Sequence, residues 1–183
     1  MSWLFHLLAN NPNYQDIIRD EGIAINSRID NSNMLNKFVQ TNAVIDETMR
    51  LYPAGWVIAR DILTDTTLGK YSLKKGSLIA LSPLVTHRDP RFFINPDSFI
   101  PERFIEGSSQ YHPLTKNSYL PFSLGRRNCI GSRFAQLEMC IFTQLFFKKF
   151  RVTTTQKQIA MKGFVTLKTA EHVILNISKV EVV

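Results

Sequence analysis

The apolar positions of this chain recur at helical spacing in its first third. We expect helices over residues 1–9 and 12–21, and a longer helix over residues 34–52 that Pro53 stops. Residues 23–32 between these segments are polar, and they are predicted to form a loop. The chain therefore begins with helices.

Short apolar runs with strand character follow in the middle of the chain. We predict strands at residues 56–60, 71–73 and 78–81, with a turn at Lys75-Gly76. Residues 88–120 are rich in Pro, Asn and Ser and have no strong periodicity. They are predicted to form a long irregular meander.

The last third returns to a helix and then to strands. Residues 164–167 and 173–177 are predicted to form a terminal hairpin. A long apolar run after Gly131 predicts a helix buried on nearly all sides, because its apolar residues occupy several faces: Phe134, Leu137, Met139, Ile141, Phe142, Leu145 and Phe146. The expected fold class is α+β, mainly α.

Composition limits the size and the class of the fold. A chain of 183 residues with 44% hydrophobic and 11% aromatic residues can bury one core, so we expect one domain over residues 1–183. The net charge of +7 and the pI near 9.6 are compatible with binding to nucleic acid or to an anionic membrane. The basic residues are dispersed, however, and no recognition motif accompanies them. A nucleic-acid module is therefore only a weak alternative.

Cysteine and histidine usage indicates no disulfide framework and no zinc site. The two cysteines are Cys129 and Cys140, and the four histidines lack zinc spacing. We expect Cys140, on the apolar helix, to be a core residue. Residues 3–8 are too short to cross a bilayer and lack the basic start of a signal peptide. We expect an intracellular, cytoplasmic location, with a membrane anchor elsewhere in a longer protein as the alternative.

The decapeptide FSLGRRNCIG is the most specific motif in the chain. A thiolate that binds haem iron needs an accessible sulfur and protection from water. Cys129 supplies the sulfur, Gly125 permits a backbone closed to residues with a Cβ, and Gly131 leaves room for a flat macrocycle. Arg127 is spaced to reach an acidic group at the edge of the macrocycle, and Phe122 can cover the ring. Taken alone, Cys129 would more often be a buried, inert cysteine, but its neighbours favour the ligand.

Three further motifs precede this loop in a fixed order. They are Glu-Thr-Met-Arg at 47–50, His-Arg-Asp-Pro at 87–90 and Pro-Glu-Arg-Phe at 101–104. With the cysteine loop, they resemble the cytochrome P450 family over essentially the whole chain. The resemblance implies the C-terminal part of that fold: the end of the central helix, the E-x-x-R helix, a small β-sheet, the meander, the cysteine ligand loop and the helix after it.

The resemblance also implies roles for four charged residues. Glu47 and Arg50, three apart on one helix face, would form a buried structural cluster with Arg103. The alternative is an ordinary solvated pair at the helix surface. Arg60 stands where the family places an arginine on a haem propionate, whereas by itself it would be a surface charge at a strand end.

Two stretches resemble the substrate-facing parts of the family. One contains Gly55, Trp56 and Ile58, and the other is the turn near Val165 and Thr166. Core packing explains Trp56 and Ile58 equally well.

The activity that the resemblance implies is that of a haem-thiolate monooxygenase. Such an enzyme accepts two electrons from a reductase or ferredoxin, splits O₂ and inserts one oxygen atom into a small organic substrate. Arg126 and Arg133 flank the cysteine, where the family commonly receives an acidic electron donor; a solvated positive surface is equally compatible with them. We expect no nucleic-acid partner and no membrane segment in this chain.

The acidic residue and the threonine that activate oxygen in the family have no counterpart here, and we assign no role to Ser2 and no catalytic residue. We therefore expect the C-terminal part of a larger enzyme, with little activity on its own. The alternative is a noncatalytic haem-binding remnant.

Overall fold

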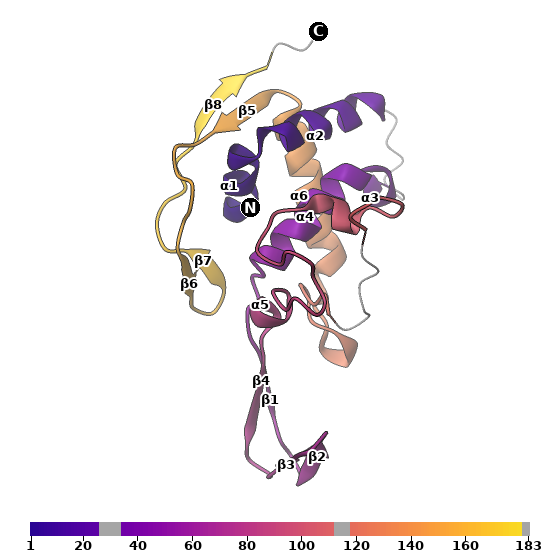
Figure 1. The fold of residues 1–183 in the computed structure, drawn as a ribbon, viewed down its shortest axis with the longest axis vertical. Helices are drawn as coiled ribbons and strands as arrows, with labels where there is room; N and C mark the ends of the chain where they lie inside the picture. Colours follow the sequence, from indigo (N-terminus) through magenta and orange to yellow (C-terminus); the bar gives the residue numbers. More distant parts are fainter. Residues whose placement is uncertain (26–33, 112–117, 181–183) are drawn as a thin grey trace.

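The computed structural model describes residues 1–25, 34–111 and 118–180. A helical body carries a long two-stranded arm, and further strand pairs lie along another side of the body (Figure 1). The helices are α1 (Ser2–Asn10), α2 (Pro12–Ala24), α3 (Met34–Lys37), α4 (Val39–Leu51), α5 (Pro83–Thr86) and α6 (Ser132–Phe147), with 3₁₀ turns η2 (Pro101–Phe104) and η3 (Gly125–Arg127). The strands are β1 (Ile58–Asp61), β2 (Thr66–Leu68), β3 (Tyr71–Leu73), β4 (Leu78–Leu81), β5 (Phe150–Thr153), β6 (Met161–Gly163), β7 (Leu167–Thr169) and β8 (Asn176–Lys179).

The core lies where α1, α2, α4, α6 and β5 meet. Leu8, Ile18, Phe147 and Val152 are fully buried there. The buried amide of Gln15 joins three of these elements. Its Nε2 donates to the carbonyls of Leu8 at 2.8 Å and Val152 at 2.9 Å, and its Oε1 accepts from the Val152 amide at 2.9 Å. Because each polar atom of this side chain is bonded, its burial carries little desolvation penalty.

The first turn of α4 is held by a residue from another helix. Phe38, the residue before α4, forms no side-chain cap, but the Glu21 carboxylate accepts from the amides of Gln40 at 2.7 Å and Thr41 at 2.9 Å. A carboxylate at a helix N-terminus bonds free amides and also complements the helix dipole. Glu21 on α2 therefore fixes the start of α4.

The strands form four antiparallel pairs: β1 with β4, β2 with β3, β5 with β8, and β6 with β7. The predicted hairpin between residues 164–167 and 173–177 is wrong. Strand β7 pairs with β6, and β8 pairs with β5 across more than twenty residues of chain. Local alternation marks a strand but does not choose its partner, so the sequence pattern could not distinguish these pairings.

The predicted helices are present, with changed limits. The segment 34–52 is divided at Phe38 into α3 and α4, and α2 extends to Ala24, into the predicted loop. The rest of that loop, residues 26–33, lies outside the described residues, as do residues 112–117 of the meander. None of the helices in the described part of the chain is long and apolar enough to cross a membrane.

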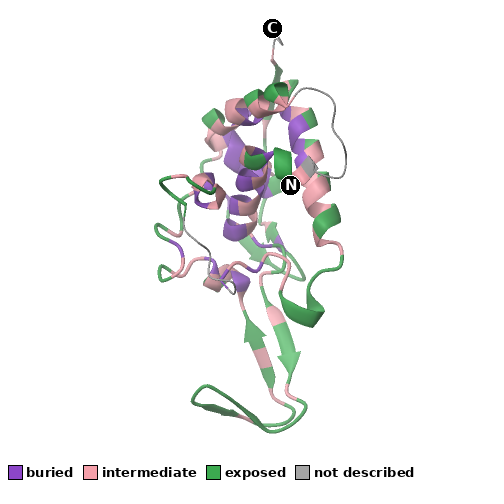
Figure 2. Ribbon diagram, turned by 90° about the vertical axis from the view of Figure 1, so that its right-hand side faces the viewer, coloured by how far each residue is buried: buried purple, intermediate pink, exposed green. Residues whose placement is uncertain are grey.

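Helix α6 is less buried than its composition predicts. Phe134 is 72% exposed and Leu145 64% exposed, and Phe142 is also exposed, while Cys140 and Phe147 are buried. The expectation of a helix buried on nearly all sides is wrong, because among the described residues the buried positions of α6 lie on one face. Buried residues gather in the helical body, whereas the β1–β4 arm is exposed along most of its length (Figure 2).

Candidate haem-thiolate site

The cysteine loop runs from Phe122 to the start of α6. The Cys129 amide donates to the Phe122 carbonyl at 2.9 Å, which closes the loop, and the Asn128 amide donates to the Gly125 carbonyl at 3.1 Å. Cys129 is exposed. A Cβ placed on Gly131 would lie 4.0 Å from the Cys129 sulfur, so the bare backbone of this glycine lies beside the sulfur. The loop therefore presents an accessible thiol with unobstructed backbone next to it.

Two residues of this loop have a left-handed backbone. Gly125 has a φ of +76° and Ser123 a φ of +67°. Glycine adopts this conformation without strain, as the sequence analysis predicts for Gly125. Ser123 has a Cβ, so its left-handed conformation costs roughly 1 kcal/mol. The folded chain thus holds a locally unfavourable conformation in the cysteine loop.

Arg60 and the cysteine loop border one small cavity. This cavity has a volume of about 170 Å³, and Arg60 and Ile58 of β1 line it together with Leu120, Ser123 and Leu124. The Arg60 guanidinium is exposed and donates to its neighbouring Ala59 carbonyl at 2.8 Å. Arg127 is exposed on η3. Among the described residues neither arginine forms a salt bridge, so both are free to pair with an anionic group beside the loop.

Glu47, Arg50 and Arg103 form a buried cluster. Arg50 Nε lies 2.6 Å from Glu47 Oε2, and Arg103 Nε lies 3.2 Å from Glu47 Oε1. The side chains of Glu47 and Arg50 are 0% exposed. This burial excludes the solvated surface pair that spacing alone left open.

The Arg50 guanidinium uses all five of its N–H donors. Two bonds go to the Glu47 carboxylate, and the others go to the carbonyls of His87 at 2.7 Å, Pro96 at 2.7 Å and Ser98 at 3.1 Å. A planar guanidinium can bind a carboxylate and several carbonyls together, which an ammonium cannot reproduce. Arg50 therefore fastens α4 to His87 and to two points of the meander.

His87 connects the same helix to the start of the cysteine loop. Its Nδ1 lies 3.1 Å from the Arg50 carbonyl, and its Nε2 accepts from the Leu120 amide at 2.7 Å. The residue is fully buried, and burial lowers the pKa of His87 to about 4. The motif that contains His87 does not indicate this role, because both contacts join segments more than thirty residues apart.

Asp46 and Tyr119 form a second connection that sequence analysis missed. The Tyr119 hydroxyl lies 3.0 Å from both the carboxylate and the carbonyl oxygen of Asp46. Burial raises the pKa of Asp46 to about 6, although the Tyr119 hydrogen bond opposes that shift. Tyr119 directly precedes Leu120, so two adjacent residues before the loop are held, Tyr119 by α4 and Leu120 by His87.

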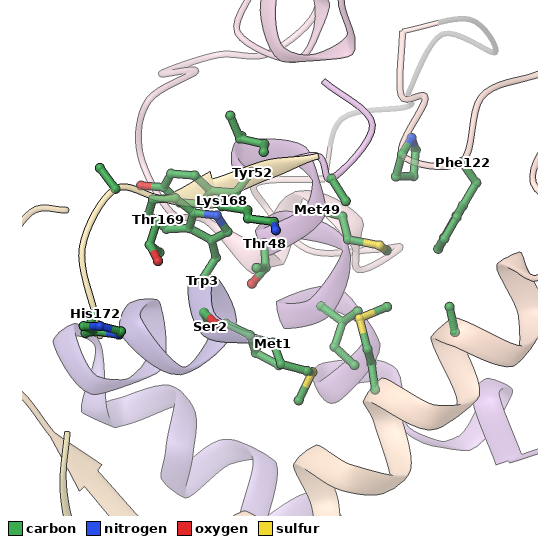
Figure 3. A pocket seen from close by; sticks show the side chains of 18 of the residues that line it. Met1, Ser2, Trp3, Thr48, Met49, Tyr52, Phe122, Lys168, Thr169 and His172 are labelled. Carbon is green, nitrogen blue, oxygen red and sulfur yellow. The ribbon is translucent and has the colours of Figure 1, made fainter. Parts of the chain in front are cut away.

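A larger cavity of about 770 Å³ opens between α1, α4, α6 and the β7 segment (Figure 3). Phe122 and Met49 project toward it, and Ala135 and Met139 line it from α6. On the opposite side, Trp3 is stacked on Tyr52 with ring centroids 3.9 Å apart. A cavity of this size, with mostly apolar lining, can accept a large flat ligand or part of one together with a substrate.

The two stretches predicted to face substrate lie side by side. The Trp56 indole donates to the Phe164 carbonyl at 2.9 Å, and the Leu167 amide donates to the Ala54 carbonyl at 3.0 Å. Ala54 and Leu167 line the larger cavity, whereas Val165 is exposed to solvent. The structure therefore brings these stretches together at the edge of the cavity.

Comparisons with known proteins agree with this arrangement of residues. A sequence model of cytochrome P450 matches residues 1–175, nearly the whole chain. The chain belongs to the cytochrome P450 family. Cytochrome P450 4V2 of mouse is 36% identical over 162 residues, which cover 86% of this chain and 30% of the mouse protein. Cytochrome P450 714A2 of Arabidopsis thaliana is 37% identical over 156 residues, which cover 84% of this chain and 29% of that protein.

A solved P450 structure has the same fold. The cyanobacterial CYP120A1, solved with retinoic acid bound, superposes with a TM-score of 0.85 and is 24% identical. The match covers 98% of this chain and 41% of that one. The chain thus has the fold of part of a P450, mainly helical with small sheets, and spans about three-tenths of the length of the curated relatives above.

The cofactor of this family is haem held by a cysteine thiolate, and the residues present fit that group. Cys129 offers an accessible sulfur on a loop with a bare glycine beside it. Within the described part of the chain, Arg127 in this loop and Arg60 across the small cavity form no salt bridge. Cys140 has none of the features that suit Cys129 to bind iron. It is buried on α6, and burial raises the pKa of its thiol to about 12, so that it stays neutral.

Proposed function

We propose that this chain is the haem-binding C-terminal segment of a cytochrome P450 monooxygenase that inserts one oxygen atom from O₂ into an organic substrate. The observation that carries the proposal is the cysteine loop, in which an exposed thiol lies between a left-handed glycine and a glycine that leaves the sulfur unobstructed. A haem bound to such a thiolate supplies O–O cleavage, because the electron-rich sulfur promotes it.

In this proposal the chain's own residues bind and position the cofactor. Cys129 is the iron ligand, and Phe122 covers the ring from the cavity side. Arg60 and Arg127 pair with the haem propionates, for which an unpaired guanidinium is well suited. Glu47, Arg50 and Arg103 act at a distance by holding α4 and the meander in register. The stretches at Trp56 and Val165 border the substrate.

The two cysteines provide a matched test of ligation. The haem-loaded protein, reduced under carbon monoxide, should show the strongly red-shifted Soret band of a thiolate-bound haem. Cys129→Ser should lose this band, whereas Cys140→Ala should keep it, because Cys140 is buried away from the loop. Retention of the band in Cys129→Ser, or its loss only in Cys140→Ala, would refute the assignment.

We further propose that an acidic reductase or ferredoxin docks near Arg126 and Arg133. Both side chains are exposed, and they lie on either side of Cys129 along the chain, on η3 and α6. Charge complementarity mainly raises the rate of association. Arg126→Glu with Arg133→Glu should slow the reduction of the haem at low salt, whereas Lys179→Glu on β8 should not. An equal effect of the control would argue against this docking site.

A second candidate is that these 183 residues alone bind haem without catalysing oxygenation. The observation that favours it is the exposed apolar face of α6, where Phe134 and Leu145 contact little else. Exposed apolar area costs about 25 cal/mol per Å², so such a face is typical of a surface that further polypeptide covers. Haem retention together with coupled product formation by residues 1–183 would decide against this candidate.

A further inference from the structure

His87 occupies the junction between the buried charge cluster and the cysteine loop. It follows α5 directly and is 0% exposed. Its backbone carbonyl accepts from Arg50 Nη1 at 2.7 Å, while its ring contacts the Arg50 carbonyl and the Leu120 amide. A single residue thus contacts α4 twice and the loop entrance once.

The hydrogen bonds define the state of the imidazole. The Leu120 amide can only donate, so Nε2 must carry the lone pair that accepts from it. The Arg50 carbonyl can only accept, so Nδ1 must carry the proton. Arg50 lies in the last turn of α4, where carbonyls lack an intrahelical partner. The neutral Nδ1–H form of His87 therefore satisfies two buried backbone groups that would otherwise be unpaired.

The contact between His87 and Leu120 matters because Leu120 lies close to the cysteine loop in the sequence. Leu120 lies two residues before Phe122, whose carbonyl receives the Cys129 amide. Between Leu120 and Cys129 the loop contains two left-handed residues, so its conformation is not fixed by local preference alone. The His87 ring therefore connects α4 to Leu120, two residues before the loop begins.

We infer that His87 is a positioning residue for the thiolate: its imidazole sets the place of the cysteine loop relative to α4 through Leu120. The inference rests on the proposed ligation of haem by Cys129. Burial keeps the imidazole neutral by lowering its pKa, and the positive charges of Arg50 and Arg88 lower that pKa further. The Tyr119 ring packs at 5.4 Å from the imidazole and also shields it from water.

The test uses the haem-loaded protein, and its readout is the Soret band under carbon monoxide. His87→Leu keeps a similar volume but has neither a donor nor an acceptor. We expect the ratio of unshifted to red-shifted band to rise about ten-fold, which is the effect of losing the one ring hydrogen bond that reaches Leu120. His87→Gln, whose amide has both a donor and an acceptor, should restore most of the red-shifted band. The reduction potential of the haem should shift in His87→Leu and return in His87→Gln.

Matched controls separate positioning from general stability. Ile18→Ala removes a fully buried side chain of α2, far along the chain from the loop, and should lower the unfolding midpoint while leaving the ratio of the two bands unchanged. Lys179→Leu removes an exposed side chain of β8, which lines neither cavity, and should change neither. An equal band ratio in wild type and His87→Leu, or a ratio in Ile18→Ala that rises with its loss of stability, would overturn the inference.

The two proposals fail in different ways. If Cys129→Ser keeps the red-shifted band, the ligation and the positioning role are both wrong. If Cys129→Ser loses the band while both His87 variants keep it, ligation holds and only the positioning role is wrong. Should His87→Leu not fold, His87→Gln alone decides: a wild-type band supports the inference, and a band fully lost in a folded protein contradicts it.

Discussion

Replacing Arg50 by methionine should prevent the chain from folding around its haem. The substitution keeps an apolar stem but removes every donor of the guanidinium. Of the partners that the described residues give Glu47, its buried charge would then keep the Arg103 contact at 3.2 Å and the Ile100 amide at 2.8 Å. The three backbone carbonyls that Arg50 now binds would also lose a donor.

The expected loss can be added up from these contacts. Breaking a buried ion pair by removing one partner costs about 3 to 5 kcal/mol, and the lower end applies because Arg103 still contacts Glu47. Each buried carbonyl left without a donor adds about 1 kcal/mol. The total, about 6 kcal/mol, equals a large part of the 5 to 15 kcal/mol that stabilises a typical domain. Arg50→Met should therefore give little soluble haem protein.

Two other arginines provide a graded comparison. Arg103→Met should cost about half as much, since Arg103 makes one contact to Glu47 and bonds to the carbonyls of Ile94 and Asn95. Arg88→Met should cost less than about 1 kcal/mol, because its partner Asp97 is 84% exposed. The free energy of unfolding in urea, followed by far-UV circular dichroism, measures the series. An Arg50→Met protein as stable as Arg88→Met would refute the reasoning.

Three further outcomes are expected. Asp46→Asn should raise the free energy of unfolding by about 2 kcal/mol at neutral pH and by little near pH 4. The reason is that folding raises the pKa of Asp46 to about 6, so wild-type stability falls as the pH rises through that value. Equal gains at both pH values would contradict this. The folded state lowers the pKa of His87 to about 4, so the wild-type free energy of unfolding should fall by about 3 kcal/mol as the pH falls from 6.5 through 4. His87→Gln should not show this loss when stability is measured against pH. Ser123→Gly should raise the unfolding free energy by about 1 kcal/mol, because glycine adopts the φ of +67° without strain, and a loss of stability would show that the serine side chain contributes more than its backbone costs.

The sequence indicates the cysteine loop itself but not the contacts that attach it to the rest of the fold. The residues FSLGRRNCIG carry their own pattern, and Glu47 and Arg50 show their pairing through helical spacing. Arg103 entered the cluster only through the family resemblance. The His87 contact with Leu120 and the Asp46 contact with Tyr119 join segments that are 33 and 73 residues apart, so no local periodicity indicates them.

Helix α6 and the last strands show the same limit for the fold. Periodicity found the helix and its apolar faces, but it could not show that Phe134 and Leu145 are exposed among residues 1–25, 34–111 and 118–180. Alternation indicated strands near residues 164–177, but the true partners of β7 and β8 lie in β6 and β5. In both cases the missing information concerns which distant element packs against the segment.

The use of Glu21 as the cap of α4 affects the order in which the chain can fold. A helix whose first amides are bonded by its own N-cap residue can start before it meets the rest of the protein, but the amides of Gln40 and Thr41 are bonded only after α2 has docked. The helix that carries the charge cluster therefore gains its first turn from tertiary contact. The amides of α4 should therefore exchange with solvent when α2 opens in the native state. A change that destabilises α2 would then also destabilise α4, which carries the charge cluster.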